Sequence, residues 1–180
     1  MIRKSFLASF LVALGVAVNL SLGPPLGPFL FSFGLLSICY LDAFLFTGKA
    51  GYLWKDAPGE LGMILALNMI SGWGFGRLLA TIRPEFVSVA TGLVDSWGWT
   101  WVFFLESFLC GAIMFLCVEL YQRKTILGII LGVPIFIFCG FQHSIANIIY
   151  LGLANSFSFA IILCIIGNLL GSIFVSEITK

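Results

Sequence analysis

The most constraining feature of this sequence is a long segment without a charged side chain. No Asp, Glu, Lys or Arg occurs from Thr125 to Ser176. One polar stretch interrupts this segment and contains the only histidine of the chain: Gly140-Phe141-Gln142-His143-Ser144-Ile145-Ala146-Asn147. An unpaired polar group in hydrocarbon costs several kcal/mol, so polar groups at that depth face a bundle interior or a water-filled cavity. The stretch therefore indicates either a solute pathway or a histidine satisfied between helices.

The composition places the whole chain in a membrane. Of its 180 residues, 61% are hydrophobic and 9% are charged, and the mean hydropathy is +1.13. A soluble domain of this length does not have such a composition, whereas a multi-pass membrane protein does. The net charge of +1 offers no basic face for nucleic acid. There is no nucleophile–base pair and no metal-ligand cluster, so we expect neither an enzyme nor a cofactor or metal site.

Six apolar spans follow from the hydropathy pattern, and two of them are interrupted. The second span is interrupted at Leu45–Tyr52, where two glycines and a lysine break the apolar pattern, and the fifth at the histidine stretch. The segment Arg83–Asp95 is the only long polar connection. The expected spans are Ser5–Leu22, a second from Leu26, Leu61–Ala80, Trp99–Tyr121, a fifth from Thr125 to Leu153, and Phe157–Val175.

An even number of spans places both termini on one side of the membrane. With the N-terminus inside, Arg77 and Arg83 are the only cationic residues outside. The cationic residues inside are then Arg3, Lys4, Lys49, Lys55, Arg123, Lys124 and Lys180. The positive-inside rule therefore predicts a multi-pass protein of the cell membrane with cytoplasmic N- and C-termini.

The two halves of the chain repeat one another in order. Phe6–Leu11 recurs as Phe104–Leu109, an offset of 98 (104 − 6). The same offset lays Thr47–Lys49, in the first interruption, over Ile145–Asn147 in the second. Three spans in each copy make the copies inverted across the membrane, which points to a pathway at their interface. We expect one transmembrane domain over residues 1–180, with repeats over 1–90 and 91–180.

Three motifs of this chain resemble those of one membrane-protein family. The stretch Gly140–Asn147 closely resembles the G-F-E-H-S-[IV]-A-N signature of the formate/nitrite transporter family. Leu45-Phe46-Thr47 resembles that family's L-F-T loop, and Gly167-Asn168-Leu169-Leu170-Gly171 resembles its G-N-[IV]-[IV]-G in the final helix. The resemblance runs in order from Phe6 to Val175.

The resemblance implies an all-α membrane protein with an aquaporin-like six-helix protomer. Its helices 2 and 5 are broken and its two three-helix repeats are inverted. Family members assemble as homopentamers in the lipid bilayer, with one pore in each protomer. They pass small monovalent anions or their conjugate acids, such as formate, nitrite and hydrosulfide. We therefore expect this chain to be a channel for a small weak-acid anion.

The resemblance also assigns roles to residues. His143 lies mid-pore with Thr47 facing it, and an imidazole titrates near neutral pH, so we expect a proton relay at this histidine. Thr47 could donate a hydrogen bond to an oxyanion and accept one from the ring. The pore-loop and vestibule candidates are Phe46, Lys49, Phe141, Gln142, Ser144 and Asn147, with Phe46 and Phe141 as expected constrictions. Asn68 and Asn168 match one another in spans three and six, at an offset of 100 (168 − 68).

The chain departs from the family pattern at charged positions. Gln142 and Phe44 stand where the family has acids, and Trp99 stands where it often has a lysine. Either Lys49 replaces that lysine in attracting anions, or it only extends to the membrane interface. Asp42 either caps the broken segment or pairs with Lys49. Two other functions stay open: a pore for neutral solutes such as water, urea or undissociated acid, and a membrane scaffold without transport.

Overall fold

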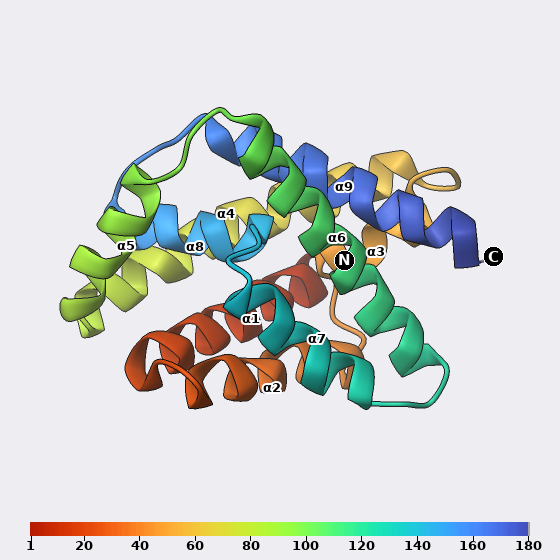
Figure 1. The fold of residues 1–180 in the computed structure, drawn as a ribbon, viewed down its shortest axis with the longest axis horizontal. Coiled ribbons are helices and arrows are strands. Elements are labelled where there is room, and N and C mark those ends of the chain that lie inside the picture. The colour runs from red at the N-terminus through yellow and green to blue at the C-terminus, as the bar shows by residue number, and fades with distance from the viewer. Residues whose placement is uncertain (180) are drawn as a thin grey trace.

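The computed structural model describes residues 1–179; Lys180, which the sequence places on the cytoplasmic side, lies outside them. Within the described residues the chain is helical, and its helices cross one another at different angles in one bundle (Figure 1). The helices are α1 Ile2–Leu22, α2 Leu26–Tyr40, α3 Phe46–Leu53, α4 Pro58–Ile82, α5 Glu85–Asp95, α6 Trp101–Gln122, α7 Leu127–Phe138, α8 Ser144–Ala154 and α9 Ala160–Thr179.

Four helices of the described chain are long and apolar enough to cross a membrane, namely α1, α4, α6 and α9. The two remaining crossings are made by the pairs α2–α3 and α7–α8, in which a non-helical segment separates two short helices. This confirms six helical crossings with the second and fifth broken. The helix ends differ from the predicted spans by about one turn.

The first break lies earlier than the sequence indicates. Residues 41–45 are non-helical, whereas Thr47, Gly48 and Lys49 form the first turn of α3. The helix restarts here because the Leu45 carbonyl accepts the N–H groups of both Gly48 and Lys49. Tertiary contacts thus override the low helix propensity of two glycines in this short segment.

The segment predicted as a polar connection contains a helix. Within Arg83–Asp95, residues 85–95 form α5. Its buried side chains, Phe86, Ala90 and Val94, recur every four residues and so form one apolar stripe. α5 packs against α8, which explains why an amphipathic connection folds instead of remaining a loop.

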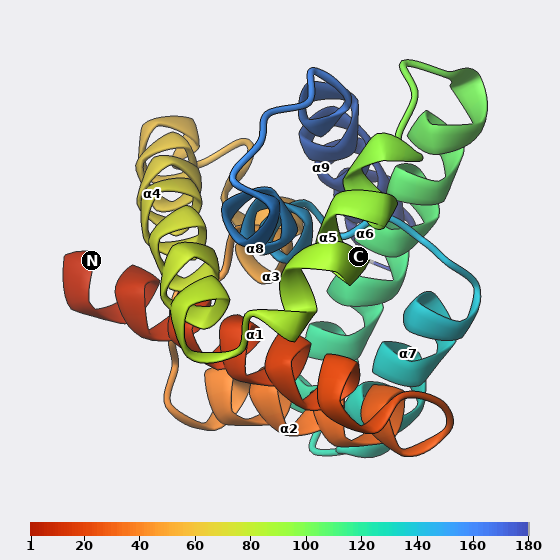
Figure 2. The ribbon, with the colours of Figure 1, turned by 90° about the vertical axis from the view of Figure 1, so that its left-hand side faces the viewer.

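The helices form two equivalent sets. α1 packs against α2 and α4, and α6 packs correspondingly against α7 and α9. The short helices pack against the opposite set: α3 of the first set packs against α9 of the second, and α8 of the second set packs against α4 of the first. Viewed onto α5, α8 lies at the centre with α3 behind it, and the longer helices surround them (Figure 2). This arrangement agrees with inverted three-helix repeats, and the predicted boundary at residue 90 falls within α5.

Glycines allow the closest helix contact, between α6 and α9. A Cβ atom on Gly111 would overlap the backbone of Asn168, and one on Gly171 would overlap the backbone of Phe108. Small residues of this kind let helices approach without a hydrophobic driving force between them, as membrane helices require.

The two ends of the bundle are distinct. Lys4, at the start of α1, pairs with Asp42, and Lys55, after α3, pairs with Glu177 near the end of α9. These pairs place the start and the end of the described chain at one end, which we call the terminal side. Figure 1 shows α5 at the opposite end, which we call the α5 side.

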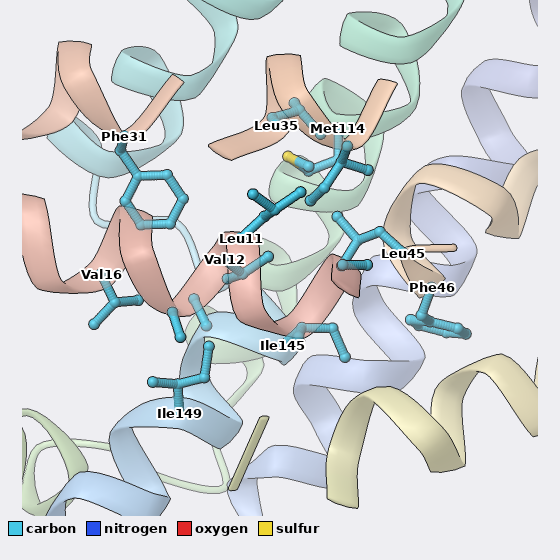
Figure 3. Close-up of a cluster of buried hydrophobic side chains, with 14 of the residues drawn as sticks. Leu11, Val12, Val16, Phe31, Leu35, Leu45, Phe46, Met114, Ile145 and Ile149 are labelled. Carbon is cyan, nitrogen blue, oxygen red and sulfur yellow. The ribbon is translucent and has the colours of Figure 1, made fainter. Parts of the chain in front are cut away.

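The two breaks lie between these ends, packed in an apolar core. It contains Leu45 from the first break and Ile145 from the start of α8, packed with α1 side chains such as Leu11 and Val12 (Figure 3). Both breaks therefore lie inside the protein, where irregular backbone at membrane depth is tolerated.

Candidate functional site: the two breaks and their cavities

Thr47 and His143 meet at the centre of the molecule. Thr47 lies in the first turn of α3, and His143 is the N-cap residue of α8. Thr47 Oγ1 lies 3.0 Å from His143 Nε2, and both side chains are buried. The structure thus joins the two residues that the sequence predicts for the central pore.

The histidine tautomer follows from its capping role. His143 Nδ1 accepts the backbone N–H of Ala146 at 3.1 Å. A ring nitrogen that accepts a hydrogen bond has no proton, so the neutral ring has its proton on Nε2. Nε2–H therefore donates to Thr47 Oγ1. Within residues 1–179 no acceptor faces the hydroxyl hydrogen of Thr47, which leaves that donor available.

Asn68 fixes the start of α3. Its side-chain Oδ1 accepts the N–H of Phe46 at 2.8 Å, and its Nδ2 donates to the carbonyl of Phe44 at 3.0 Å. The side chain is fully buried on α4. It satisfies backbone groups that the first break leaves without helical partners.

Asn168 on α9 does the same for the start of α8. Its Oδ1 accepts the N–H of Ser144 at 2.8 Å, and its Nδ2 donates to the carbonyl of Gln142 at 2.8 Å. Ser144 and Gln142 lie 98 positions after Phe46 and Phe44, the partners of Asn68 (144 − 46 and 142 − 44), so both asparagines bind corresponding residues of the repeat. The two predicted asparagines are thus equivalent clamps on the two breaks.

The clamped helices direct hydrogen-bond donors at the centre. The N-terminal ends of α3 and α8 both lie at the Thr47–His143 pair, and a helix N-terminus has a partial positive charge. In the described part of the chain, the backbone N–H groups of Thr47 and Ile145 have no acceptor. Donors without acceptors favour a solute that accepts hydrogen bonds.

A cavity reaches His143 from the α5 side, and Thr47 lies behind the histidine without lining it. It has a volume of about 340 Å³, and its walls include His143, Asn147, Phe141, Phe31 and Phe136. The Phe136 ring stacks on the His143 ring with centroids 5.7 Å apart, and Phe31 packs edge-on against Phe136 at 6.1 Å. The histidine thus lies on the wall of a cavity beside two packed phenylalanine rings.

Gln142 lies at the rim of this cavity and joins three elements. Its Nε2 donates to Glu106 Oε2 at 3.1 Å, and its Oε1 accepts from Asn147 Nδ2 at 3.0 Å. A glutamate at position 142 would lie against the Glu106 carboxylate, and Trp99 supplies no charge to compensate. An uncharged amide is therefore the compatible partner for Glu106 here.

A second cavity opens on the terminal side. It has a volume of about 220 Å³, and its walls include Leu45, Gly48, Lys49, Asp42 and Cys39. Lys49 Nζ lies 3.4 Å from Asp42 Oδ1. Of the two predicted roles for Asp42, the structure supports pairing with Lys49, since α3 has no side-chain cap.

Comparison with known proteins supports one fold. No family model and no curated protein matches the sequence. The structure is similar to a solved FNT family ion channel, with a TM-score of 0.76 and 21% identity over 99% of this chain and 86% of that chain. It is also similar to a solved pentameric formate channel with formate bound, with a TM-score of 0.72 and 18% identity over 99% of this chain and 94% of that chain. The chain has the fold of these channels. The predicted fold class is thereby confirmed.

Within this channel fold, two predicted vestibule residues lie elsewhere. Phe46 is 2% exposed and lines neither of the two cavities, and a constriction at this residue stays a prediction. Its ring packs at the edge of the apolar core, because the first residue of α3 is directed into the protein (Figure 3). Ser144 is likewise fully buried beside the second break. Phe141 does line the α5-side cavity.

The channel fold also brings in residues that sequence analysis did not select. Phe31 and Phe136 form the aromatic wall at His143, but the sequence has 19 phenylalanines and nothing distinguishes these two. Lys4 reaches the terminal-side cavity only through Asp42, which lies 38 positions away in the chain. Glu106, in contrast, stands out in the sequence, because it is an acid in the interior of the span Trp99–Tyr121.

Proposed function

We propose that this protein is a membrane channel for a small monovalent weak-acid anion of the formate, nitrite or hydrosulfide type. The observation that carries the proposal is the buried Thr47–His143 pair, joined at 3.0 Å where two half-helices begin. Residues of the first break line the terminal-side cavity, and residues of the second break line the α5-side cavity. The fold shared with a formate channel supports the same class of solute.

The chemistry of the centre fits an anion. An anion that enters an apolar constriction loses hydration at a cost of several kcal/mol or more. Hydrogen bonds from the Thr47 hydroxyl and from backbone N–H groups replace part of that hydration, and the positive ends of α3 and α8 add a favourable field. A cationic solute would find donors where it needs acceptors.

We propose that His143 acts in the resting channel as a fixed, neutral donor. Its Nε2–H holds the Thr47 oxygen, so that the Thr47 hydroxyl hydrogen is directed to the solute. A second proton on the ring has to bind Nδ1, and this would break the cap on Ala146. The proton relay expected from sequence would thus require the start of α8 to loosen at each cycle.

A pore for neutral solutes is the second candidate. The uncharged Gln142 amide at the rim and the aromatic wall of Phe31 and Phe136 favour it. Undissociated acid or urea would also accept hydrogen bonds from Thr47. The two candidates differ in whether flux follows the concentration of the anion or that of the neutral acid.

We further propose that the protein is a homopentamer of the cell membrane with both termini in the cytoplasm. Large apolar side chains are exposed on all four long helices, for example Phe10, Ile70, Leu109 and Ile166. Lipid and neighbouring protomers are the partners that such surfaces require. Native mass spectrometry in mild detergent should show pentamers, whereas monomers alone would contradict the assembly.

The function is tested by flux into proteoliposomes that contain the purified protein. Formate uptake by stopped-flow fluorescence should exceed that of protein-free vesicles, and it should follow formate anion when pH is varied at constant formic acid. Uptake that follows only formic acid would favour the neutral-solute pore. No uptake of formate, nitrite, hydrosulfide, water or urea would favour a scaffold.

A further inference from the structure

Two lysines share one aspartate at the mouth of the terminal-side cavity. Asp42 Oδ2 pairs with Lys4 Nζ at 2.5 Å, and Asp42 Oδ1 pairs with Lys49 Nζ at 3.4 Å. The side chains of Lys4, Asp42 and Lys49 are 44%, 64% and 29% exposed, so Lys49 is the most enclosed of the three. The cluster has a net charge of +1, from two ammonium groups and one carboxylate.

The aspartate is shared unequally. The contact with Lys4 is short, whereas 3.4 Å is beyond the usual length of an N–H···O hydrogen bond. Lys49 lines the cavity together with Gly48 of the first α3 turn, and Lys4 does not line it. The ammonium that faces the pathway is therefore the one that Asp42 neutralises less.

Among residues 1–179, Asp42 is the one acid that pairs with these two lysines. Both ammonium groups lie over the Phe44 ring, at 5.1 Å for Lys4 and 5.2 Å for Lys49. A ring face attracts a cation without neutralising its charge. The other polar side chains on the cavity wall, Tyr121 and Gln122, are uncharged.

We propose that Lys49 is an anion-loading site of the terminal-side cavity, and that Lys4 is a positioning residue that keeps Asp42 from neutralising Lys49. The ligand is a small monovalent anion of carboxylate or nitrite size, and the inference rests on the proposed function. Lys49 takes up the anion from solution and passes it toward Thr47, two residues earlier in the same helical turn. Steering of this kind can raise association rates by roughly 10- to 1,000-fold.

The sharing geometry predicts a specific pattern of mutant effects. Lys49→Met removes the site and lowers anion flux. Lys4→Met frees Asp42 to pair fully with Lys49, so flux falls although Lys49 is intact. Asp42→Asn raises flux, because it removes the competing carboxylate. In Asp42→Asn, the additional change Lys4→Met has no effect, since there is no carboxylate left to position.

Lys55→Met is the matched control. Lys55 is a lysine of the same side, and it pairs with Glu177 at 2.7 Å without lining the cavity. Its removal changes the net charge as much as Lys49→Met does. Formate flux in Lys55→Met should equal that of the wild type, which separates a local site from a general effect of charge.

The experiment measures formate flux into proteoliposomes at low salt and again at about 1 M salt, where the Debye length falls to about 3 Å. Flux is normalised to folded protein by size-exclusion chromatography. We expect Lys49→Met and Lys4→Met to lose about tenfold at low salt, the lower limit of steering effects. All variants should converge at high salt.

The outcomes separate this inference from the function on which it rests. Unchanged low-salt flux in Lys49→Met would overturn the loading site in a channel that still passes formate. A loss in Lys4→Met that persists with Asp42→Asn would overturn the positioning role. A wild-type protein that passes no anion would overturn the proposed function, and this inference with it.

Discussion

Thr47 Oγ1 and His143 Nε2 are joined at 3.0 Å although they belong to opposite halves of the chain. Each residue lies where a broken helix restarts, and each restart is clamped by an asparagine of a long helix. His143 has two separate roles in this contact, because Nδ1 caps α8 while Nε2 holds Thr47. Substitutions that separate these roles give the first prediction.

His143→Asn should keep the cap and lose the contact with Thr47. The Asn oxygen is an effective N-cap acceptor, but its side chain is too short to reach Thr47. We expect thermal stability near that of the wild type and formate flux reduced roughly tenfold or more, since a hydrogen bond to a charged group contributes about 1.5–3 kcal/mol. His143→Ala should in addition lose about 1 kcal/mol of stability with the cap.

The pH dependence of the same variant separates a donor from a relay. For a fixed neutral donor, the ratio of anion flux in His143→Asn to that in the wild type stays constant between about pH 5 and pH 8. A titrating relay would instead make this ratio change near the ordinary pKa of histidine, about 6.5. A pH-dependent ratio would therefore restore the relay expected from the sequence.

Asn68→Ala and Asn168→Ala should destabilise the protein to a similar degree. Each leaves a buried N–H and buried carbonyls without partners, and each unsatisfied group costs about 1–3 kcal/mol. Thermal unfolding in detergent should show comparable decreases in Tm. A large decrease for only one of the two would contradict equivalent clamps.

Gln142→Glu should disturb the α5-side rim, because it places a second carboxylate against Glu106. We expect a lower Tm at pH 7 for this variant. The double variant Gln142→Glu/Glu106→Gln restores one acid and one amide, and it should recover most of the loss. Failure of the double variant to recover would show that the rim does not depend on this pair.

Gly171→Ala should prevent normal packing of α9 on α6, since its Cβ would overlap the Phe108 backbone. Gly62→Ala on α4 is the matched control, because no atom lies within 4 Å of its Cβ position. The control should be neutral or stabilising by up to about 1 kcal/mol, as expected for alanine in a helix. Size-exclusion chromatography of both variants provides the comparison.

Sequence patterns predict those features of the fold that depend on a single short segment of the chain. The hydropathy pattern predicts the six crossings, and the histidine stretch together with the L-F-T motif predicts the central pair. The hydrogen bonds of Asn68 and Asn168 also follow the repeat offset. The sequence does not reveal contacts that depend on the packing of distant segments. Phe136 on His143, Gln142 on Glu106 and Lys4 on Asp42 are of this kind.

The break in helix 2 shows the same limit. Two glycines at positions 48 and 51 argue against a helix when only the local sequence is considered. The structure makes them helical because Gly51 packs beneath Phe115 and against the Ser172 backbone, where a larger residue does not fit. The glycines therefore serve a close helix contact, and the break forms before them.

The most direct test of the central claim is formate flux through Thr47→Val, compared with Thr47→Ser, in proteoliposomes. Valine retains the shape of threonine and removes the hydroxyl donor that we assign to the solute, whereas serine keeps it. We predict that Thr47→Val lowers formate flux at least tenfold per folded protein and that Thr47→Ser stays within about twofold of the wild type, given about 1.5–3 kcal/mol for a charged hydrogen bond. Equal formate flux in the wild type and Thr47→Val would contradict it.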